Sequence, residues 1–248
     1  MTELIPNVKR TILLALIPFL FYNVAKSQTD QMSVLVFSKT SGYRHESIET
    51  GIATVTKMGT KYDFDVDATE DASMFKRDIL SKYDVVIFMC TTKDVLDDTQ
   101  QNEFIAYIQS GGAFVGVHAA ADTEYEWPWY NKLVGAWFKS HPKTQEAVVQ
   151  RINPTHVSTK MLPDRWTRTD EWYNYKNIAT DINVLLKLDE SSYEGGDNNG
   201  DHPIAWYHEF DGGRAWYTGL GHTKESYSDP LFVDHLWGGI QYAAGLAN

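Results

Sequence analysis

An apolar segment runs into a turn of small residues at Ala113-Phe114-Val115-Gly116-Val117-His118-Ala119-Ala120-Ala121-Asp122. Sharp turns from a strand into a helix need Gly or Ala around the central residue, because larger side chains do not fit. Such turns lift the side chain at their apex over the end of a sheet. The apex residue here is His118 rather than Ser or Cys. The segment therefore predicts an active-site scaffold whose chemistry depends on histidines and carboxylates.

The segments before this turn alternate between strand and helix patterns, which is typical of a parallel α/β sheet. The first and third of the predicted helices have apolar residues at helical spacing, and Gly111-Gly112 ends the third. Strands are predicted over residues 33–38, 64–67 and 84–89, and helices over residues 46–58, 73–81 and 98–110.

The segments after the turn are richer in strands. Asp211-Gly212-Gly213 predicts a hairpin turn, and Asp229-Pro230 predicts the start of a final helix that runs to Ala244. We therefore expect one layered α/β domain over residues 28–248, in which helices cover a mixed, mostly parallel sheet. The strands predicted in this half cover residues 146–152, 168–173, 184–188, 204–210 and 214–220.

The first residues have the pattern of an export signal. Lys9-Arg10 precedes an apolar run over residues 11–24, which ends at Ala25-Lys26-Ser27. The run is short for a membrane span, and its small-x-small ending favours cleavage before Gln28. An uncleaved membrane anchor is the alternative. We expect residues 1–27 to be a Sec-type signal peptide and the mature protein to be periplasmic or secreted, without a stable membrane anchor.

The charge of the chain excludes one class of partner. It carries 22 basic and 33 acidic residues, and removal of residues 1–27 takes away three basic residues and one acidic residue, which leaves 19 − 32 = −13. Such a surface repels nucleic acid. The one cysteine, Cys90, follows an apolar run and is expected to be a buried structural thiol. An exported protein without a disulfide is more typical of a bacterial periplasm than of eukaryotic secretion.

Histidines follow three of the predicted strands. Ligands of α/β sheets bind beyond the carboxyl ends of the strands, so residues at those ends are expected to converge. The motifs are Gly42-Tyr43-Arg44-His45 after the first strand, His118 after the central strand and Gly221-His222 after the last hairpin.

Several motifs, in order along the chain, resemble those of the ThuA-like family, which is named for trehalose utilisation. The resemblance runs from about Ser33 to Ala244 and implies a class I glutamine amidotransferase-like fold, flavodoxin-like in its layers, and a link to sugar catabolism. The motifs are Gly42-Tyr43-Arg44-His45-Glu46-Ser47, Gly116-Val117-His118-Ala119-Ala120, Ser140-His141-Pro142, Asp170-Glu171-Trp172-Tyr173, Pro203-Ile204-Ala205-Trp206 and Gly219-Leu220-Gly221-His222.

The resemblance also bears on the reaction. Glutaminases of this superfold carry a Cys at the turn and a His followed shortly by Glu near the last strand. Here His118 stands at the turn, while His222 and Glu225 stand where the His and Glu would be. The missing Cys argues against a glutaminase.

The leading hypothesis is an acid–base enzyme, a hydrolase, lyase or isomerase, that acts on a glycoside or keto-sugar, either trehalose-like or a 3-keto-glycoside. The alternatives are a non-catalytic carbohydrate-binding module and a metal-dependent sugar hydrolase or isomerase. Carboxylates near several imidazoles suit a divalent metal as well as proton transfer, but their spacing matches no tight ligand signature. No cofactor is predicted, and a metal stays open. The predicted catalytic residues are His118, His222, Glu171, Asp122 and Glu225.

A second group of residues is expected to bind a small-molecule sugar. Sugars stack their C–H faces on aromatic rings, and Trp127-Pro128-Trp129, directly after the turn, is the best candidate for a stacking platform. Core packing is the alternative for the tryptophans, and a surface ion pair is the alternative for Arg44. The oligomeric state is left open. The predicted binding residues are Tyr43, Arg44, His45, Trp127, Trp129, His141, Trp172 and Trp206.

Overall fold

The structure is a computed structural model that describes Met1 and residues 31–248. The expected signal peptide and its cleavage site, apart from Met1, lie outside the described residues. Residues 31–248 form one unit. Among the described helices, none combines the length and the hydropathy that a membrane span requires.

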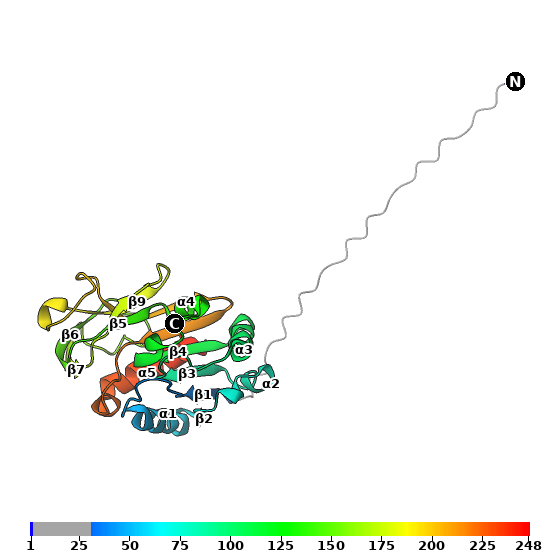
Figure 1. Cartoon of the computed structure of the whole chain (residues 1–248), viewed down its shortest axis with the longest axis horizontal. Coiled ribbons are helices and arrows are strands. Elements are labelled where there is room, and N and C mark those ends of the chain that lie inside the picture. The colour runs from blue at the N-terminus through cyan, green and yellow to red at the C-terminus, as the bar shows by residue number, and fades with distance from the viewer. Residues whose placement is uncertain (2–30) are drawn as a thin grey trace. The chain divides into compact units, whose positions relative to one another are not determined.

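A nine-stranded sheet carries the site, in the order β2-β1-β3-β4-β11-β10-β9-β6-β7 (Figure 1). The first five of these strands are parallel and the rest pair antiparallel, which confirms an α/β class with a mixed sheet. A separate sheet pairs β5 (Trp137–Ser140) with β8 (Asn174–Lys176). The strands of the large sheet are β2 (Asp65–Thr69), β1 (Ser33–Phe37), β3 (Val85–Met89), β4 (Ala113–Val117), β11 (Gly213–Thr218), β10 (Pro203–Phe210), β9 (Asn183–Leu188), β6 (Gln145–Arg151) and β7 (Arg165–Asp170).

Helices cover both faces of the parallel half. On one face, α1 (Ile48–Tyr62) and α5 (Pro230–Ala243) meet where Trp237 stacks on Tyr62 at 4.2 Å between ring centroids. On the other face, α3 (Asp98–Gln109) places Phe104 against Phe114 of β4 and Trp129 of α4 (Pro128–Val134). The short α2 (Arg77–Leu80) packs on α3. Single turns of 3-10 helix are η1 (Ala72–Met74), η2 (His118–Asp122), η3 (Glu190–Ser192) and η4 (Glu225–Ser228).

Local sequence explains why these elements form. Every residue of β3 is buried, as expected for an apolar run in the centre of a parallel sheet. A capping box between Asp97 and Gln100 starts α3, and the Asp229 carboxylate accepts from the amide of Leu231 at the start of α5. Asp211 and Gly212, with φ of 50° and 95°, make the tight turn between β10 and β11.

Some elements differ from the prediction. The predicted helix over residues 73–81 is broken into η1 and α2, and α4, β5 and β8 had no prediction. Strands of three or four residues show too little alternation to be recognised in a sequence. The strand β7 also ends at Asp170, so Glu171 lies just beyond the strand rather than within it. This shift places Glu171 at the edge of the sheet where ligands bind.

A candidate histidine and glutamate centre

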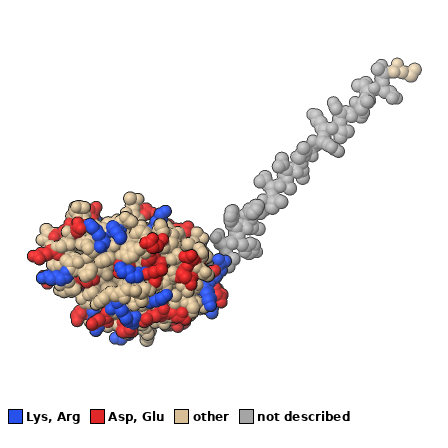
Figure 2. Space-filling model, viewed as in Figure 1, with Lys and Arg blue, Asp and Glu red and all other residues tan. Residues whose placement is uncertain are grey.

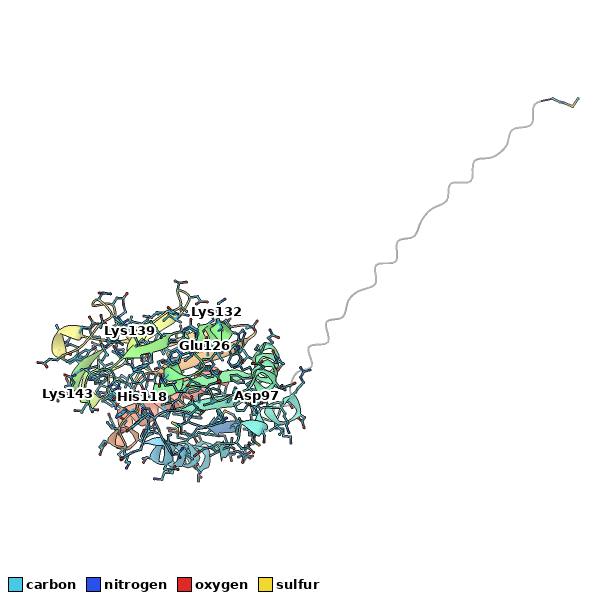
Figure 3. The ribbon with its side chains drawn as sticks, viewed as in Figure 1. Asp97, His118, Glu126, Lys132, Lys139 and Lys143 are labelled. Atoms are coloured by element: carbon cyan, nitrogen blue, oxygen red, sulfur yellow. The ribbon has the colours of Figure 1, made fainter. Side chains whose placement is uncertain are left out.

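The predicted turn carries His118 at the end of β4, near the middle of the molecule (Figure 3). Its backbone is left-handed, with φ of 48°, a conformation that non-glycine residues adopt rarely and often at functional sites. The residues around His118 are small because larger side chains would collide with their neighbours. A Cβ at Gly116 would lie 2.9 Å from the Tyr217 ring and 3.2 Å from the Cβ of Ala120.

Three histidines and one glutamate meet beyond the ends of four strands. His45 follows β1, His118 follows β4, Glu171 follows β7 and His222 follows β11. Each offers one metal-ligating atom, and these atoms all lie within 4.8 Å of one another. The three histidines thus converge as their positions at strand ends predict.

The shortest contacts in this centre join His118, His222 and Glu171. Nε2 of His118 lies 3.2 Å from Nδ1 of His222 and 3.4 Å from Oε2 of Glu171, and Nδ1 of His222 lies 3.2 Å from the same oxygen. On its other side, Nδ1 of His118 donates to the carbonyl oxygen of Gly219 over 2.9 Å. A carbonyl only accepts, so Nδ1 carries the proton and Nε2 directs its lone pair into the centre. Nε2 of His118 therefore faces Oε2 of Glu171 with lone pairs on both atoms. Such a contact is favourable only when a proton or a cation lies between the two atoms.

His45 is neutral in this environment. Its side chain is buried, and burial, followed by the nearby charges of His118 and His222, lowers its pKa to about 2. Its Nδ1 atom is buried and has no hydrogen-bond partner among the described residues. A neutral imidazole with an unsatisfied buried nitrogen is the form in which histidine binds a metal.

The contact between Glu171 and His222 lowers the pKa of Glu171 and raises the pKa of His222. Burial raises the pKa of Glu171, but the close contacts of its carboxylate with the His118 and His222 rings outweigh burial and hold that pKa well below its ordinary value. Burial lowers the pKa of His222, but the hydrogen bond and charge of Glu171 outweigh it and leave that pKa raised. Glu171 is therefore an anion, as a metal ligand or a hydrogen-bond acceptor must be.

A fourth histidine contacts the other oxygen of Glu171. Nδ1 of His141 lies 3.0 Å from Oε1 of Glu171 and 2.9 Å from the carbonyl oxygen of Pro142. Both neighbours accept hydrogen bonds, so Nδ1 carries the proton and Nε2 holds the lone pair. The His141 side chain is 43% exposed, which leaves it open to a ligand.

A buried carboxylate fixes the backbone beneath the centre. Because β7 alternates exposed and buried residues, Asp170 points inward. Its oxygens accept from the amides of Gly221 and His222 over 3.0 and 3.1 Å, and from Nη2 of Arg168 and Oγ of Ser226. Asp170 thus holds the turn that carries His222.

The centre opens into a pocket of about 410 Å³. Lys93, Phe138 and Tyr173 line it but were not predicted as site residues. Lys93 follows β3, so the same strand-end argument that found the histidines also applies to it. Phe138 lies in the unpredicted strand β5, and its sequence context carries no signal. The pocket is lined by Tyr43, His45, Lys93, Asp122, Phe138, His141, Glu171, Tyr173 and His222.

Comparison with known proteins identifies the family. The family model described as ThuA, trehalose utilisation, matches residues 33–243. The chain belongs to the ThuA family. No curated protein matches it.

Solved structures show the same fold. A ThuA-like protein from Bacteroides uniformis has 24% sequence identity and a TM-score of 0.74, with 90% of this chain and 95% of that chain covered. A ThuA-like protein from Parabacteroides merdae has 20% identity and a TM-score of 0.71, with 88% and 92% covered. A protein from Thermoplasma acidophilum that is named as part of a GMP synthase has 10% identity and a TM-score of 0.53, with 87% and 96% covered. The last likeness agrees with the expected glutamine amidotransferase-like fold.

The cysteine of this ThuA protein lies outside the pocket. Cys90 is fully buried at the end of β3, and burial raises the pKa of its thiol to about 12. A thiol with that pKa is not a nucleophile near neutral pH, so Cys90 is the buried structural thiol expected from the sequence.

Two charged residues predicted for the site lie elsewhere in this ThuA chain, which corrects the prediction. Arg44 forms exposed ion pairs with Glu49 at 2.7 Å and Glu70 at 2.8 Å. Glu225 is exposed at the start of η4 and does not line the pocket. Glu171, supplied by β7 rather than by the last strand, is the carboxylate that reaches the histidines.

The predicted tryptophan platform is also corrected. Trp127 is 8% exposed and stacks on Trp129 and Tyr130. Trp129 packs against the core, and its Nε1 donates to Asp211 in the β10–β11 turn. The fully buried Trp172 and Trp206 donate to backbone carbonyls of Gln145 and Val134. These rings pack the ThuA fold, since aromatic density alone does not distinguish a core from a sugar site.

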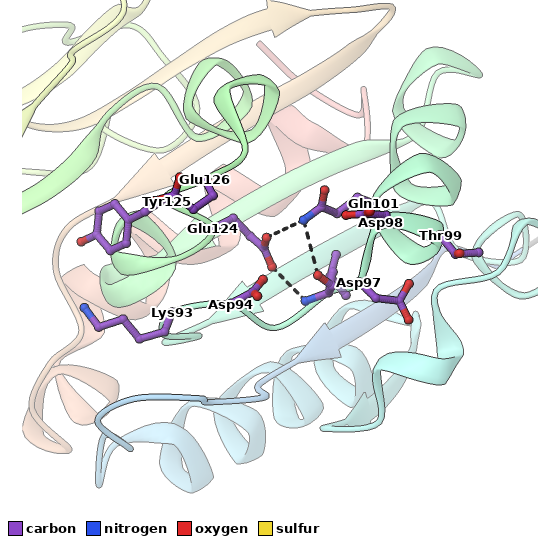
Figure 4. A pocket seen from close by; sticks show the side chains of 10 residues that line it. Lys93, Asp94, Asp97, Asp98, Thr99, Gln101, Glu124, Tyr125 and Glu126 are labelled. Atoms are coloured by element: carbon purple, nitrogen blue, oxygen red, sulfur yellow. Dashed lines mark hydrogen bonds between the residues drawn. The ribbon is translucent and has the colours of Figure 1, made fainter.

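A second pocket, of about 680 Å³, adjoins the first through Lys93 (Figure 4). Its buried carboxylate, Glu124, accepts from the amides of Val95 and Leu96 and from Gln101. Burial raises the pKa of Glu124 to about 6 against those hydrogen bonds. Because its contacts are made within the protein, Glu124 fixes the loop that carries Lys93.

Acidic side chains, with lysines and arginines among them, are scattered over the face shown in Figure 2, and other residues cover the rest of that face.

Proposed function

We propose that this ThuA-family protein is an exported, metal-dependent acid–base enzyme of carbohydrate catabolism that acts on a keto-sugar or a glycoside. The observation that carries the proposal is the set of four ligand atoms, from His45, His118, Glu171 and His222, within 4.8 Å of one another. The family's description, trehalose utilisation, supports a sugar as substrate. The apolar run of residues 11–24 supports export.

The residues fit a first-row divalent ion. Imidazole nitrogens with one carboxylate suit Zn²⁺, Fe²⁺ or Mn²⁺, and metal-ligating histidines characteristically donate their other nitrogen to a carbonyl, as His118 does to Gly219. The buried, unpartnered nitrogen of His45 fits the same role. When bound, such an ion polarises a carbonyl or hydroxyl oxygen of the substrate. If all four residues held the ion, a substrate could reach it only where the ion accepts further ligands, so the proposal favours Mn²⁺ or Fe²⁺ over Zn²⁺.

His141 is the residue proposed to move a proton. Its Nδ1–H donates to Oε1 of Glu171, which orients the ring and leaves Nε2 free to accept a proton from substrate. In a keto-sugar, the hydrogen on the carbon beside the carbonyl is acidic. Removal of that proton is the first step both of isomerisation and of elimination of a glycosidic oxygen. The same dyad therefore serves an isomerase or a lyase.

The test is turnover by the purified mature protein on trehalose and on its 3-keto derivative, before and after chelation. The proposal expects activity that chelation removes and Mn²⁺ or Fe²⁺ restores. A matched control is His208→Ala, which removes a buried histidine outside the pocket. Activity that survives complete metal removal would contradict the proposed metal dependence. Sugar binding without turnover on either compound would favour the non-catalytic alternative.

A further inference from the structure

We infer that the pocket binds one neutral pyranose ring, with its C–H face on Phe138 and two neighbouring hydroxyl groups on Asp122 and Lys93. The inference rests on the proposed function, because it specifies how the sugar sits beside the histidine and glutamate centre. It replaces the tryptophan platform, which the structure places in the core.

Phe138 and Tyr43 supply the apolar surface. Phe138 is half-buried, lines the pocket and packs on Tyr173 at 4.4 Å between centroids. Tyr173 is buried and lies 4.2 Å from the His118 ring, so Phe138 is the member of this pair with the more accessible ring. Tyr43 is 63% exposed and packs edge-on against His45. Aromatic rings left accessible on a polar pocket are typical of sites that stack a sugar ring.

Asp122 and Lys93 supply matched polar groups. Oδ1 of Asp122 accepts from Nζ of Lys93 over 2.7 Å and from the hydroxyl of Tyr125, whereas no described residue donates to Oδ2. Lys93 has two further N–H groups and a side chain that is 48% exposed. Each sugar hydroxyl both donates and accepts, so a carboxylate oxygen beside an ammonium group is complementary to two adjacent hydroxyls.

The backbone holds this pair in place before a ligand binds. Lys93 is left-handed, with φ of 62°. Its amide donates to the carbonyl of Asp122 over 2.7 Å, and its carbonyl accepts from the amide of Glu124. A strained residue fixed by hydrogen bonds on both sides is pre-organised, which lowers the cost of ordering it on binding.

The charges and size of the pocket select the class of ligand. Among the described residues, Lys93 is the one lysine or arginine that lines it, whereas Asp122 and Glu171 contribute two carboxylates. A sugar acid or sugar phosphate would add a further negative charge, so a neutral sugar is favoured. The volume of about 410 Å³ lies in the range of small-molecule sites.

The experiment measures dissociation constants of the metal-free mature protein for methyl α-D-glucopyranoside and for sorbitol, an acyclic polyol without a ring face. We expect the glucoside to bind more tightly than sorbitol. Phe138→Leu, which keeps an apolar side chain, and Asp122→Asn are each expected to weaken glucoside binding by about tenfold. Trp129→Ala, a half-buried aromatic residue outside the pocket, is the matched control and should bind like the wild type.

Several results would overturn the inference: no glucoside binding by the wild type, equal binding of sorbitol, or unchanged binding by both pocket variants. This binding experiment uses the metal-free protein, so its result does not depend on whether the protein binds a metal. If the pocket variants lose glucoside binding but the protein neither binds metal nor turns over a sugar, the inference stands and the proposed catalytic function fails.

Discussion

Nδ1 of His141 lies 3.0 Å from Oε1 of Glu171, while Oε2 of the same carboxylate faces His118 and His222. One carboxylate thereby connects the exposed His141 to His118 and His222. This division separates two roles, since loss of His141 removes a proton-transfer group but leaves His45, His118, Glu171 and His222 in place.

His141→Gln is expected to lower turnover by about 10²–10⁴-fold, the usual contribution of one general acid or base. Metal content should stay at the wild-type level, because His141 is not among the four converging ligands. Parallel measurement of kcat and of bound metal checks this. A variant that loses metal together with activity would show that His141 belongs to the ligand set.

His118→Ala and His222→Ala should both lose activity but differ in stability. Both residues follow strand ends, but the structure buries His118 fully and leaves the His222 side chain 21% exposed. His118→Ala also leaves the Gly219 carbonyl without its donor, at a cost of about 1–3 kcal/mol. Thermal unfolding of the metal-free variants should show the larger loss for His118→Ala, and equal losses would contradict the buried position.

Asp170→Asn should destabilise the protein strongly. The change removes the buried charge that pairs with Arg168 and replaces one of the two accepting oxygens of Asp170 by an NH2 group, and a broken buried ion pair costs about 3–5 kcal/mol. Asp197→Asn breaks only the exposed pair with Lys139 and should cost about 0–1 kcal/mol. Urea unfolding of the two variants gives the comparison, and similar midpoints would show that Asp170 does not organise the site.

The pH dependence of stability should report on His45. Its folded pKa is lowered from 6.5 to about 2, so the unfolded chain takes up a proton that the folded chain refuses. This contribution to stability is present above pH 6.5 and is lost as the pH falls below it. The metal-free His45→Gln variant should therefore lose less stability than the wild type between neutral and mildly acidic pH. A steeper loss in the variant would show that His45 is charged in the folded protein.

The first residue of the recovered protein tests the proposed export. Mass spectrometry of protein recovered from the periplasm or medium of a bacterial host should give a chain that begins at Gln28. Ala25→Leu should block cleavage, because signal peptidases need a small residue at that position. Recovery of the wild-type protein as a full-length chain in the cytoplasm would contradict export.

The sequence revealed those site residues that have a local signature. The small residues around His118 indicate the turn. His45 and His222 follow strands that are recognisable in the sequence, so the positions of all three histidines could be inferred without a structure. Phe138 could not, because it lies in a strand of four residues that pairs only with another short strand. The identity of a residue was misleading where tertiary packing decides its role. Trp206 has an aromatic ring suited to a sugar but is fully buried, and its Nε1 donates to the carbonyl of Val134, far away in the sequence.

The central claim is that His45, His118, Glu171 and His222 hold one divalent ion. Titration of the metal-free mature protein with Co²⁺, followed by visible absorption, tests it most directly, because ligation by imidazole and carboxylate produces d–d bands that free aqueous Co²⁺ lacks at that intensity. We predict bands that saturate at a single equivalent in the wild type and in His208→Ala, and that are lost in His45→Ala and Glu171→Ala. A wild-type spectrum identical to that of free Co²⁺, or bands that persist in both site variants, would contradict the account.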